Sequence, residues 1–389
     1  MSPVLPLETA SSEALRLLVD LVRLPAFSGA EEAAADYVQA QMLALGFEGV
    51  RRDPLGNVIG IWPGEQSGPT LLLDSHLDVV AVGVENAWHY PPFGGIVENG
   101  RVWGRGAADT HASLAAMLAA VASLPRSELR GQVVLAATVL EETLTGRAVE
   151  DLLALYHPTV FITGEPTNLR LAVAQKGRAT LEISAQGRAA HTSHPQQGEN
   201  AIQRMMAALA RLEAMPRRYD EDLGEEIFVV TDICSEPYPN ISLVPPRCQA
   251  HVVARLVPGE TAASLLTRVR QALEDTPRVD VNLATLRQMC YTGRVLEGVD
   301  FLPAWKVPPD NPWRVRILDA LRSQGLPAET MAAGFGTNAS AATERGITAF
   351  IYGPGDLAQA HIVDEWIAVE QVARAVWGYR TLVQACLGG

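Results

Sequence analysis

An apolar run that ends abruptly in polar residues constrains the fold of this chain more than any other feature. Residues 71–73 are three leucines, and the segment that follows reads Asp-Ser-His-Leu-Asp. A continuously apolar run of this kind is typical of a strand buried on both faces, as in the parallel sheets of α/β proteins. Because side chains alternate along a strand, His76 and Asp78 are expected to point the same way from its end. Such a pair suits metal binding, although a histidine beside an acid is more often structural.

Helix and strand patterns alternate on either side of this run. Helical spacing of apolar residues predicts a helix over residues 12–24 and a second one from Ser28, in a capping box with Glu31. An alanine-rich helix is expected over residues 113–124, and strands over residues 57–62, 70–73, 133–140 and 160–163. This alternation predicts an α/β fold whose mixed, mostly parallel sheet is flanked by helices.

The pattern changes between residues 176 and 287. Residues 180–186 alternate polar and apolar side chains, as in a sheet with one face in water. Helices are expected over residues 200–215 and 261–273, and strands over 228–234, 249–256 and 279–286. This is the βαββαβ order of a ferredoxin-like α+β domain. Since a helix (312–323) and a strand (349–352) then resume the α/β pattern, we predict a discontinuous large domain (1–175 and 288–389) with an insertion (176–287).

Charge and cysteine content exclude several classes of protein. The net charge of −13 argues against a nucleic-acid partner, because binding to phosphates requires clustered Lys and Arg. The four cysteines form no Cys-x-x-Cys pair, which indicates a reducing compartment. No leader pattern and no apolar run of about 18 residues is present. We therefore expect a cytoplasmic protein with no membrane partner.

Residues that can bind metals follow each of the expected strands. The strand over 133–140 runs into two glutamates, the strand over 160–163 into Gly-Glu-Pro, and the strand over 349–352 into a turn that leads to a histidine. A glycine-rich segment, residues 104–109, ends in an aspartate before the alanine-rich helix. The carboxyl ends of strands in an open α/β sheet line one crevice. We expect six side chains to converge there: His76, Asp109, Glu141, Glu142, Glu165 and His361.

Each acid also has an ordinary structural interpretation. Asp109 could cap the following helix, Glu141 and Glu142 could be solvated turn residues, and Glu165 could lie on the surface. Those interpretations leave several like charges at one crevice, which is costly unless a cation is present. Two zinc ions with a charge of about +4 would balance a bridging carboxylate, two terminal carboxylates and a hydroxide. The charge balance thus favours two metal ions over one.

The same segments resemble a known family of metallopeptidases and deacylases. Residues 74–78, 104–109, 141–142 and 164–167, with the late His361, are similar in order and type to those of acetylornithine deacetylase, succinyl-diaminopimelate desuccinylase and carboxypeptidase G. The resemblance covers nearly the whole chain. It implies two zinc ions, with cobalt or manganese as possible substitutes. The implied ligands are His76 and Glu165 for one ion, Glu142 and His361 for the other, and Asp109 as the bridge.

The resemblance also implies roles for residues that do not bind the metals. Asp78 would orient the His76 ring, and Glu141 would be the general base. One departure from the family is that relatives usually carry Lys and then Gly after the bridging aspartate, whereas Thr110, His111 and Ala112 follow it here, with His111 in place of the usual Lys. We expect His111 to pack near the metals rather than to act as a sixth ligand.

The inserted domain resembles the family's lid and dimerisation domain. His191 matches the histidine that reaches the active site of a dimer partner and stabilises the oxyanion. Asn240 and Arg255 match positions that contact the substrate, although both could instead be structural. The loop that contains Thr337 and Asn338 also looks like a substrate-side loop. The resemblance thus implies a homodimer formed through the inserted domain, which is residues 176–287.

The predicted activity is hydrolysis of the amide bond of a small N-acyl amino acid by a metal-activated water, with Glu141 as general base. A zinc exopeptidase, acting as a dipeptidase, aminopeptidase or carboxypeptidase, is the alternative within the same class. A non-catalytic, metal-dependent binding protein is the alternative in another class. An intact Glu141 disfavours this last alternative, because a protein that only binds has no need of a base.

Overall fold

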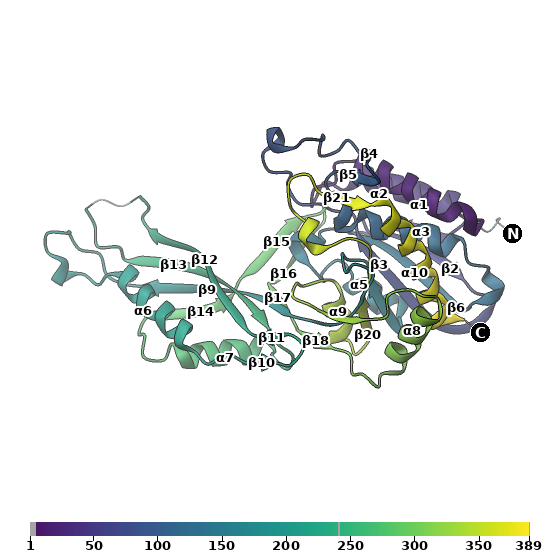
Figure 1. Ribbon diagram of the computed structural model, residues 1–389. Helices are drawn as coiled ribbons and strands as arrows, with labels where there is room; N and C mark the ends of the chain where they lie inside the picture. Colours follow the sequence, from purple (N-terminus) through teal and green to yellow (C-terminus); the bar gives the residue numbers. More distant parts are fainter. Residues whose placement is uncertain (1–4, 240–241, 389) are drawn as a thin grey trace.

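The computed structural model describes residues 5–239 and 242–388. Figure 1 shows two lobes, of which the larger holds both ends of the described chain and the smaller is built from its middle part. In the part of the chain that is described, no helix combines the length and the apolar character needed to cross a membrane. The four cysteines are free, and three of them are buried.

A nine-stranded mixed sheet forms the centre of the larger lobe. Its order is β1-β2-β6-β3-β7-β20-β8-β18, and β19 pairs with β8. The central strands β6, β3, β7 and β20 are parallel, whereas β1, β2, β8 and β18 pair antiparallel with their neighbours in this order. The bounds are β1 (Glu48–Arg52), β2 (Val58–Pro63), β3 (Gln66–His76), β6 (Arg130–Thr138), β7 (Val160–Thr163), β8 (Leu171–Gln175), β18 (Trp305–Lys306), β19 (Thr330–Ala333) and β20 (Thr348–Ile351).

Helices cover both faces of this sheet, as predicted. Helices α1, α3, α8 and α10 pack against one another, and α3 is buried along its whole length because its small side chains allow close approach. Ser75 points toward Thr110 before α3, whereas its neighbour Asp74 points toward Asn338 before α9. Since neighbouring side chains lie on opposite faces, α3 and α9 cover opposite sides. The bounds are α1 (Leu7–Val22), α2 (Glu32–Ala44), α3 (Ala112–Ala122), α4 (Glu141–Leu144), α5 (Glu150–Tyr156), α8 (Pro312–Ser323), α9 (Ala339–Glu344) and α10 (Val369–Leu387).

The start of the second helix differs from the prediction. Helix α2 begins at Glu32, and no side chain caps it. The Ser28 hydroxyl instead donates to Asp78 Oδ2 (2.7 Å), and Glu31 Oε1 accepts a hydrogen bond from the Leu140 backbone (3.1 Å). The predicted capping box is therefore wrong, because both side chains are directed toward the carboxyl end of the sheet.

The smaller lobe has the predicted βαββαβ order. Its sheet runs β14-β9-β13-β12, and β17 also pairs with β9. Inward residues of β9 alternate with partly exposed ones, and α6 and α7 pack on the inward side. A short hairpin, β10 with β11, precedes β12. The bounds are β9 (Gly177–Gln186), α6 (Ala201–Ala214), β10 (Tyr219–Asp220), β11 (Gly224–Glu225), β12 (Ile227–Glu236), β13 (Arg247–Leu256), α7 (Ala262–Ala272), β14 (Val279–Leu283) and β17 (Phe301–Leu302).

The expected strand over residues 279–286 is divided in two. β14 ends at Leu283, and β15 (Thr285–Met289) then pairs with β16 (Val295–Val299) in a separate hairpin. Leu286 and Leu296 of this hairpin pack against the core of the larger lobe, which pulls it away from β14. The chain then returns to the smaller lobe at β17. A three-stranded sheet of β4 (Ile96–Glu98), β5 (Arg101–Trp103) and β21 (Trp366–Ala368) completes the larger lobe.

Candidate metal centre and active site

One cavity lies where the carboxyl ends of the central strands meet. Its volume is about 140 Å³, and it is lined from both lobes. β3 ends at His76, β6 leads into Glu141 and Glu142, and β7 leads into Glu165. The lining residues are Asp109, Glu141, Glu142, Thr145, Glu165, Arg178, Arg255, Phe335, Gly336, Leu357 and His361.

The five expected ligands come together around Asp109. His76 Nε2 lies 3.1 Å from Asp109 Oδ1, and His361 Nε2 lies 3.2 Å from Asp109 Oδ2. Glu165 Oε1 is 4.0 Å from His76 Nε2, and Glu142 Oε1 is 3.0 Å from His361 Nε2. Each carboxylate oxygen of Asp109 thus faces a different histidine, and each histidine has one further glutamate. This is the division into two ligand sets that the resemblance implies.

The charges of the cluster are strongly coupled. Burial opposes charge on His76, but its hydrogen bond with Asp109 and the nearby Glu165 raise its pKa well above the ordinary value. Hydrogen bonds to Asp109 and then to Glu142 raise the pKa of His361 to about 10. Although burial alone would raise the pKa of Asp109, the two histidines hold it below the usual range.

The glutamates show why this donor set fits metal ions. Burial raises the pKa of Glu141 and Glu165 well above the ordinary value, and neighbouring acids raise both further. Glu141 Oε1 is buried and has no hydrogen-bond partner. Ligand atoms of His76, Asp109 and Glu142, and likewise of His76, Glu141 and Glu165, lie within 4.8 Å of one another. Two histidines and three carboxylates at these spacings match the ligands that zinc takes in proteins.

Asp109 does not cap the following helix. No side chain caps α3, and both oxygens of Asp109 are used by the histidines. Its position is held from behind by Glu365, whose Oε1 accepts hydrogen bonds from the Ala108 and Asp109 backbones (2.9 and 3.1 Å). Glu365 is in turn paired with Arg105 at 2.6 Å, and both are buried. This pair was not predicted from the sequence, although Glu365 lies only a few residues after His361.

A comparison of the sequence with protein-family models identifies the family of this chain. The model described as peptidase family M20/M25/M40 matches residues 72–385. The chain belongs to this family. It is therefore a metal-dependent hydrolase of the M20/M25/M40 type, as predicted from the sequence, and the side chains that could hold metal ions lie within the matched residues.

Individual relatives agree with this assignment. The Escherichia coli K12 protein YgeY is 30% identical over 363 residues, which cover 90% of this chain and 88% of YgeY. Succinyl-diaminopimelate desuccinylase of Cereibacter sphaeroides is 30% identical over 289 residues, 69% of this chain and 74% of that enzyme. A Bacillus subtilis structure described as a dinuclear metal binding peptidase of family M20 has a TM-score of 0.72 at 14% identity, covering 97% of this chain and 98% of that one. At that identity the structural likeness establishes the fold alone.

In this M20/M25/M40 chain, Asp78 acts differently from the prediction. His76 Nδ1 donates to the backbone oxygen of Asp78 (2.7 Å), whereas the Asp78 carboxylate is 3.7 Å away. That carboxylate accepts hydrogen bonds from the backbones of Glu141 (2.9 Å) and Glu142 (3.1 Å) and from the Ser28 hydroxyl. Asp78 thus orients the imidazole through its main chain, while its side chain holds the turn that carries the base.

Thr337 and Asn338 lie behind the metal-ligand cluster rather than in the cavity. Both are buried, and neither lines the cavity. Asn338 donates to Asp74 Oδ2 (3.0 Å) and accepts a hydrogen bond from the Gly146 backbone, while Thr337 donates to Gln175 (2.6 Å). Their side chains are occupied in holding the sheet, and a contact of either residue with the substrate stays a prediction.

The unusual His111 packs as expected and does not face the ligands. It is buried, and its Nε2 donates to the Leu77 backbone oxygen at 2.9 Å, directly after His76. Burial lowers its pKa to about 4, so the ring is neutral. A Cβ atom on Gly106 would lie 2.8 Å from His111 Nδ1, so the glycine leaves room for the ring.

The remaining predicted substrate-side residues divide into three cases. Arg255 lines the cavity, as does Arg178, which the sequence analysis missed. His191 is exposed on the smaller lobe, bonded to Ser193, and does not line the cavity of its own chain. Asn240 lies outside the described residues.

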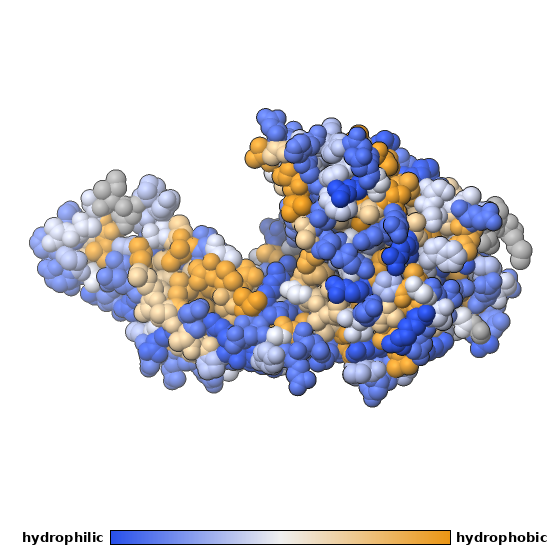
Figure 2. Space-filling model, in the orientation of Figure 1, coloured by the Kyte–Doolittle hydropathy of each residue, from blue (hydrophilic) through white to orange (hydrophobic). Residues whose placement is uncertain are grey.

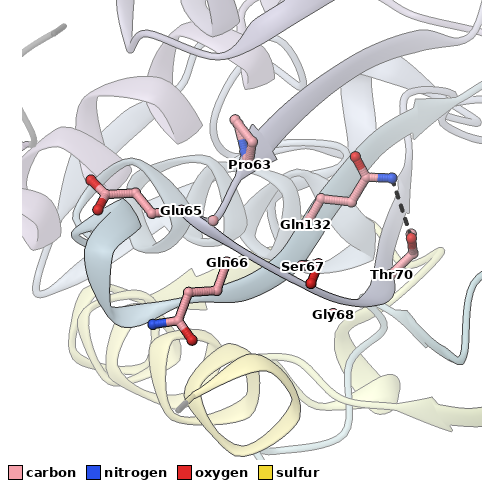
Figure 3. Close-up of a pocket in the computed structure, with 9 residues that line it drawn as sticks. Pro63, Glu65, Gln66, Ser67, Gly68, Thr70 and Gln132 are labelled. Atoms are coloured by element: carbon pink, nitrogen blue, oxygen red, sulfur yellow. Dashed lines mark hydrogen bonds between the residues drawn. The ribbon is translucent and has the colours of Figure 1, made fainter.

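A larger cavity at the opposite edge of the sheet has no comparable chemistry. Figure 3 shows this pocket of about 370 Å³ at the amino ends of β3 and β6, where Gln132 donates to Thr70. Glu65 is the one titratable residue that lines it. The glycines that line this pocket allow two backbone segments to lie close together. A Cβ atom on Gly131 would lie only 1.9 Å from the Pro69 backbone oxygen. Size alone therefore does not identify the functional site.

Proposed function

We propose that this protein hydrolyses the amide bond of a small N-acyl amino acid, with two zinc ions held by His76, Asp109, Glu142, Glu165 and His361, and with Glu141 as general base. The observation that carries the proposal is the unpartnered, buried Glu141 carboxylate in the same cavity as a complete set of ligand side chains. Cobalt or manganese could replace zinc in this donor set.

Several side chains of the protein would have distinct roles in this hydrolysis. Bound metal ions would polarise the scissile carbonyl and acidify a water molecule. Glu141, whose carboxylate lines the cavity, would take the proton and deliver it to the leaving amine. Asp78 would keep Glu141 in place through the two backbone hydrogen bonds of the turn.

Two arginines indicate that the substrate carries a carboxylate. Arg178 and Arg255 lie directly opposite each other on β9 and β13, so both point from the open face of that sheet. Asp300 bonds to Arg178 (3.0 Å), whereas in the described ranges no acid forms an ion pair with Arg255. Burial and then Arg178 lower the pKa of Arg255. A carboxylate on the substrate would relieve this uncompensated charge by bidentate binding.

Replacing Arg255 by methionine is expected to raise KM for an anionic substrate by about 10- to 100-fold, the range of a hydrogen bond to a charged group. The same substrate with its carboxylate converted to an amide should be hydrolysed equally by both proteins. Arg247→Met is the matched control, because Arg247 lies on the same strand with its side chain 71% exposed. Equal loss with the charged and the amidated substrate would contradict this role.

A zinc exopeptidase is the second candidate, because the same arginines could bind the terminal carboxylate of a dipeptide. The B. subtilis relative is itself described as a peptidase. A hydrolysis screen with N-acetyl amino acids, N-succinyl amino acids and dipeptides, each with added zinc, cobalt or manganese, tests both candidates. Turnover of N-acyl amino acids alone supports the first, and turnover of dipeptides alone supports the second.

We further propose that the protein forms a homodimer through the smaller lobe. β12 is an edge strand that exposes Ile227, Val229, Val230 and Ile233 by 46–49% each. Figure 2 shows apolar residues gathered over the strands of this lobe. An exposed apolar edge of this kind invites pairing with a second copy. In that dimer, His191 would reach the active site of the other copy.

A cytoplasmic location of the protein remains a prediction.

Mixing two inactive variants tests this arrangement. His191→Ala and Glu141→Gln are each expected to be nearly inactive. After subunit exchange, a mixed dimer has one site with both an intact Glu141 and an intact His191. Random pairing should then restore about a quarter of the wild-type activity, as expected for a two-fold symmetric dimer. Absence of recovery, with exchange verified by sedimentation of tagged subunits, would contradict a role of His191 in the other copy's site.

A further inference from the structure

The turn that carries Glu141 and Glu142 is held by side chains from other parts of the chain. Leu140 lies at the centre of this turn with φ 58° and ψ 24°, the left-handed region that leucine rarely adopts. Such a conformation persists only where its surroundings enforce it. The turn reverses the path of β6 and presents Glu141 to the cavity, so its conformation decides where the base lies.

Four consecutive backbone N–H groups of the turn donate to side chains. The Val139 N–H donates to Asn57 Oδ1 (2.9 Å), and the Leu140 N–H donates to Glu31 Oε1 (3.1 Å). The next two N–H groups donate to the Asp78 carboxylate, as described above. Buried N–H groups require partners, and no strand or helix supplies them at this turn. Three polar side chains therefore take the place of regular secondary structure.

Asn57 is rigidly fixed in this role. Its amide nitrogen donates to Asp53 Oδ2 (2.6 Å) and to the Ala148 oxygen (2.8 Å). Its oxygen is then left for the Val139 N–H alone. Asp53 is itself fixed by the backbones of its own loop. The amide thus reaches the turn from a preorganised loop between β1 and β2.

Glu31 is fully buried and has no other hydrogen-bond partner among the described side chains. It is 0% exposed, its Oε2 is unpartnered, and its Oε1 bonds to the Leu140 N–H. The carboxylate also forms backbone hydrogen bonds at Gly29 and at Glu31 itself, but burying a carboxylate is costly, and helix α2 gains no cap from it. The buried carboxylate therefore supports Leu140, the residue before the base, and does not stabilise the start of helix α2.

We propose that Glu31 and Asn57 are positioning residues, which hold Leu140 in its left-handed conformation so that Glu141 faces the cavity while Glu142 faces His361. This inference rests on the proposed function, because it assigns the turn a role in placing the general base. Neither residue touches the cavity. Their effect on hydrolysis would pass through the turn alone.

The test compares Glu31→Ala with Glu31→Gln, which keeps an oxygen for the Leu140 N–H. In saturating zinc, we expect Glu31→Ala to lower kcat by at least about tenfold with KM unchanged. Glu31→Gln should recover most of this loss. Hydrogen–deuterium exchange of a peptide that spans residues 139–142, measured without metal, should become faster in Glu31→Ala and stay slow in Glu31→Gln.

Glu226→Ala is the matched control, because Glu226 is an equally buried acid of the smaller lobe, paired with Arg268. It should destabilise the protein without changing kcat or exchange at residues 139–142. The inference is overturned if Glu31→Ala leaves both kcat and exchange unchanged, or if Glu31→Gln loses as much as Glu31→Ala. Failure of the proposed function would look different: the wild-type protein would then hydrolyse none of the substrates, while the exchange result would still report on the turn.

Discussion

Glu141→Gln is expected to lower kcat by about a thousandfold, because general base catalysis contributes roughly 10²–10⁴. Glutamine has nearly the same shape as glutamate but cannot accept the proton. The backbone of residue 141 would keep its hydrogen bond to Asp78, so the turn should remain intact. KM and metal content are therefore expected to stay near the wild-type values. Steady-state kinetics on a substrate from the screen, with metal analysis of the same samples, provides the measurement.

The exposed Thr143 on α4 supplies the control for this variant. Thr143→Ala changes a side chain two residues away that lies in solvent. It should leave kcat unchanged within about twofold, as is usual for surface substitutions. Wild-type turnover by Glu141→Gln would show that another group takes the proton.

Removal of metal by a chelator is expected to abolish activity and to destabilise the protein. Ligands that bind only the folded state add about 2.7 kcal/mol of stability at a concentration 100 times the Kd. The metal-free cluster also leaves the buried Glu141 and Glu165 beside other acids, which is unfavourable. Thermal unfolding should shift to lower temperature without metal, and added zinc, cobalt or manganese should reverse the shift.

Asp109→Ala should lower the amount of metal bound per chain, because this carboxylate lies between both histidines. His251→Ala is the control, since His251 is a partly exposed histidine of the smaller lobe. It should leave the metal content unchanged. An unchanged metal content in Asp109→Ala would contradict the bridging role.

Most of the candidate ligand cluster could be located from the sequence, because all of its members except Asp109 lie at or after the end of a recognisable strand. The apolar runs located β3, β6, β7 and β20, and the rule that strand ends share one crevice brought His76, Glu165 and His361 together. The alternating pattern of β9 likewise separated the smaller lobe. These features depend on local periodicity, which a sequence displays directly.

The supporting residues were not predictable, because their partners are far away in the chain. The sequence predicted that Glu31 is part of a helix cap, but in the structure it accepts a hydrogen bond from the backbone of Leu140, 109 residues later. The hydrogen bond from Asn338 to the buried Asp74 was not predicted either. Rules based on local sequence predict hydrogen bonds to residues nearby in the chain. They do not predict which distant backbone N–H groups the fold leaves without a partner. Arg178 was missed for the same reason, because its pairing with Arg255 depends on strand register.

The order of the ligands along the chain determines when the metal centre can form. His76, Asp109, Glu142 and Glu165 leave the ribosome early, whereas His361 and Glu365 follow only after the whole smaller lobe has been made. A nascent chain therefore carries the acids of the centre before the second histidine that offsets their charge. The proposed ligand set is therefore complete only late in biogenesis, and a chain that ends before residue 361 would display the acids without the second histidine.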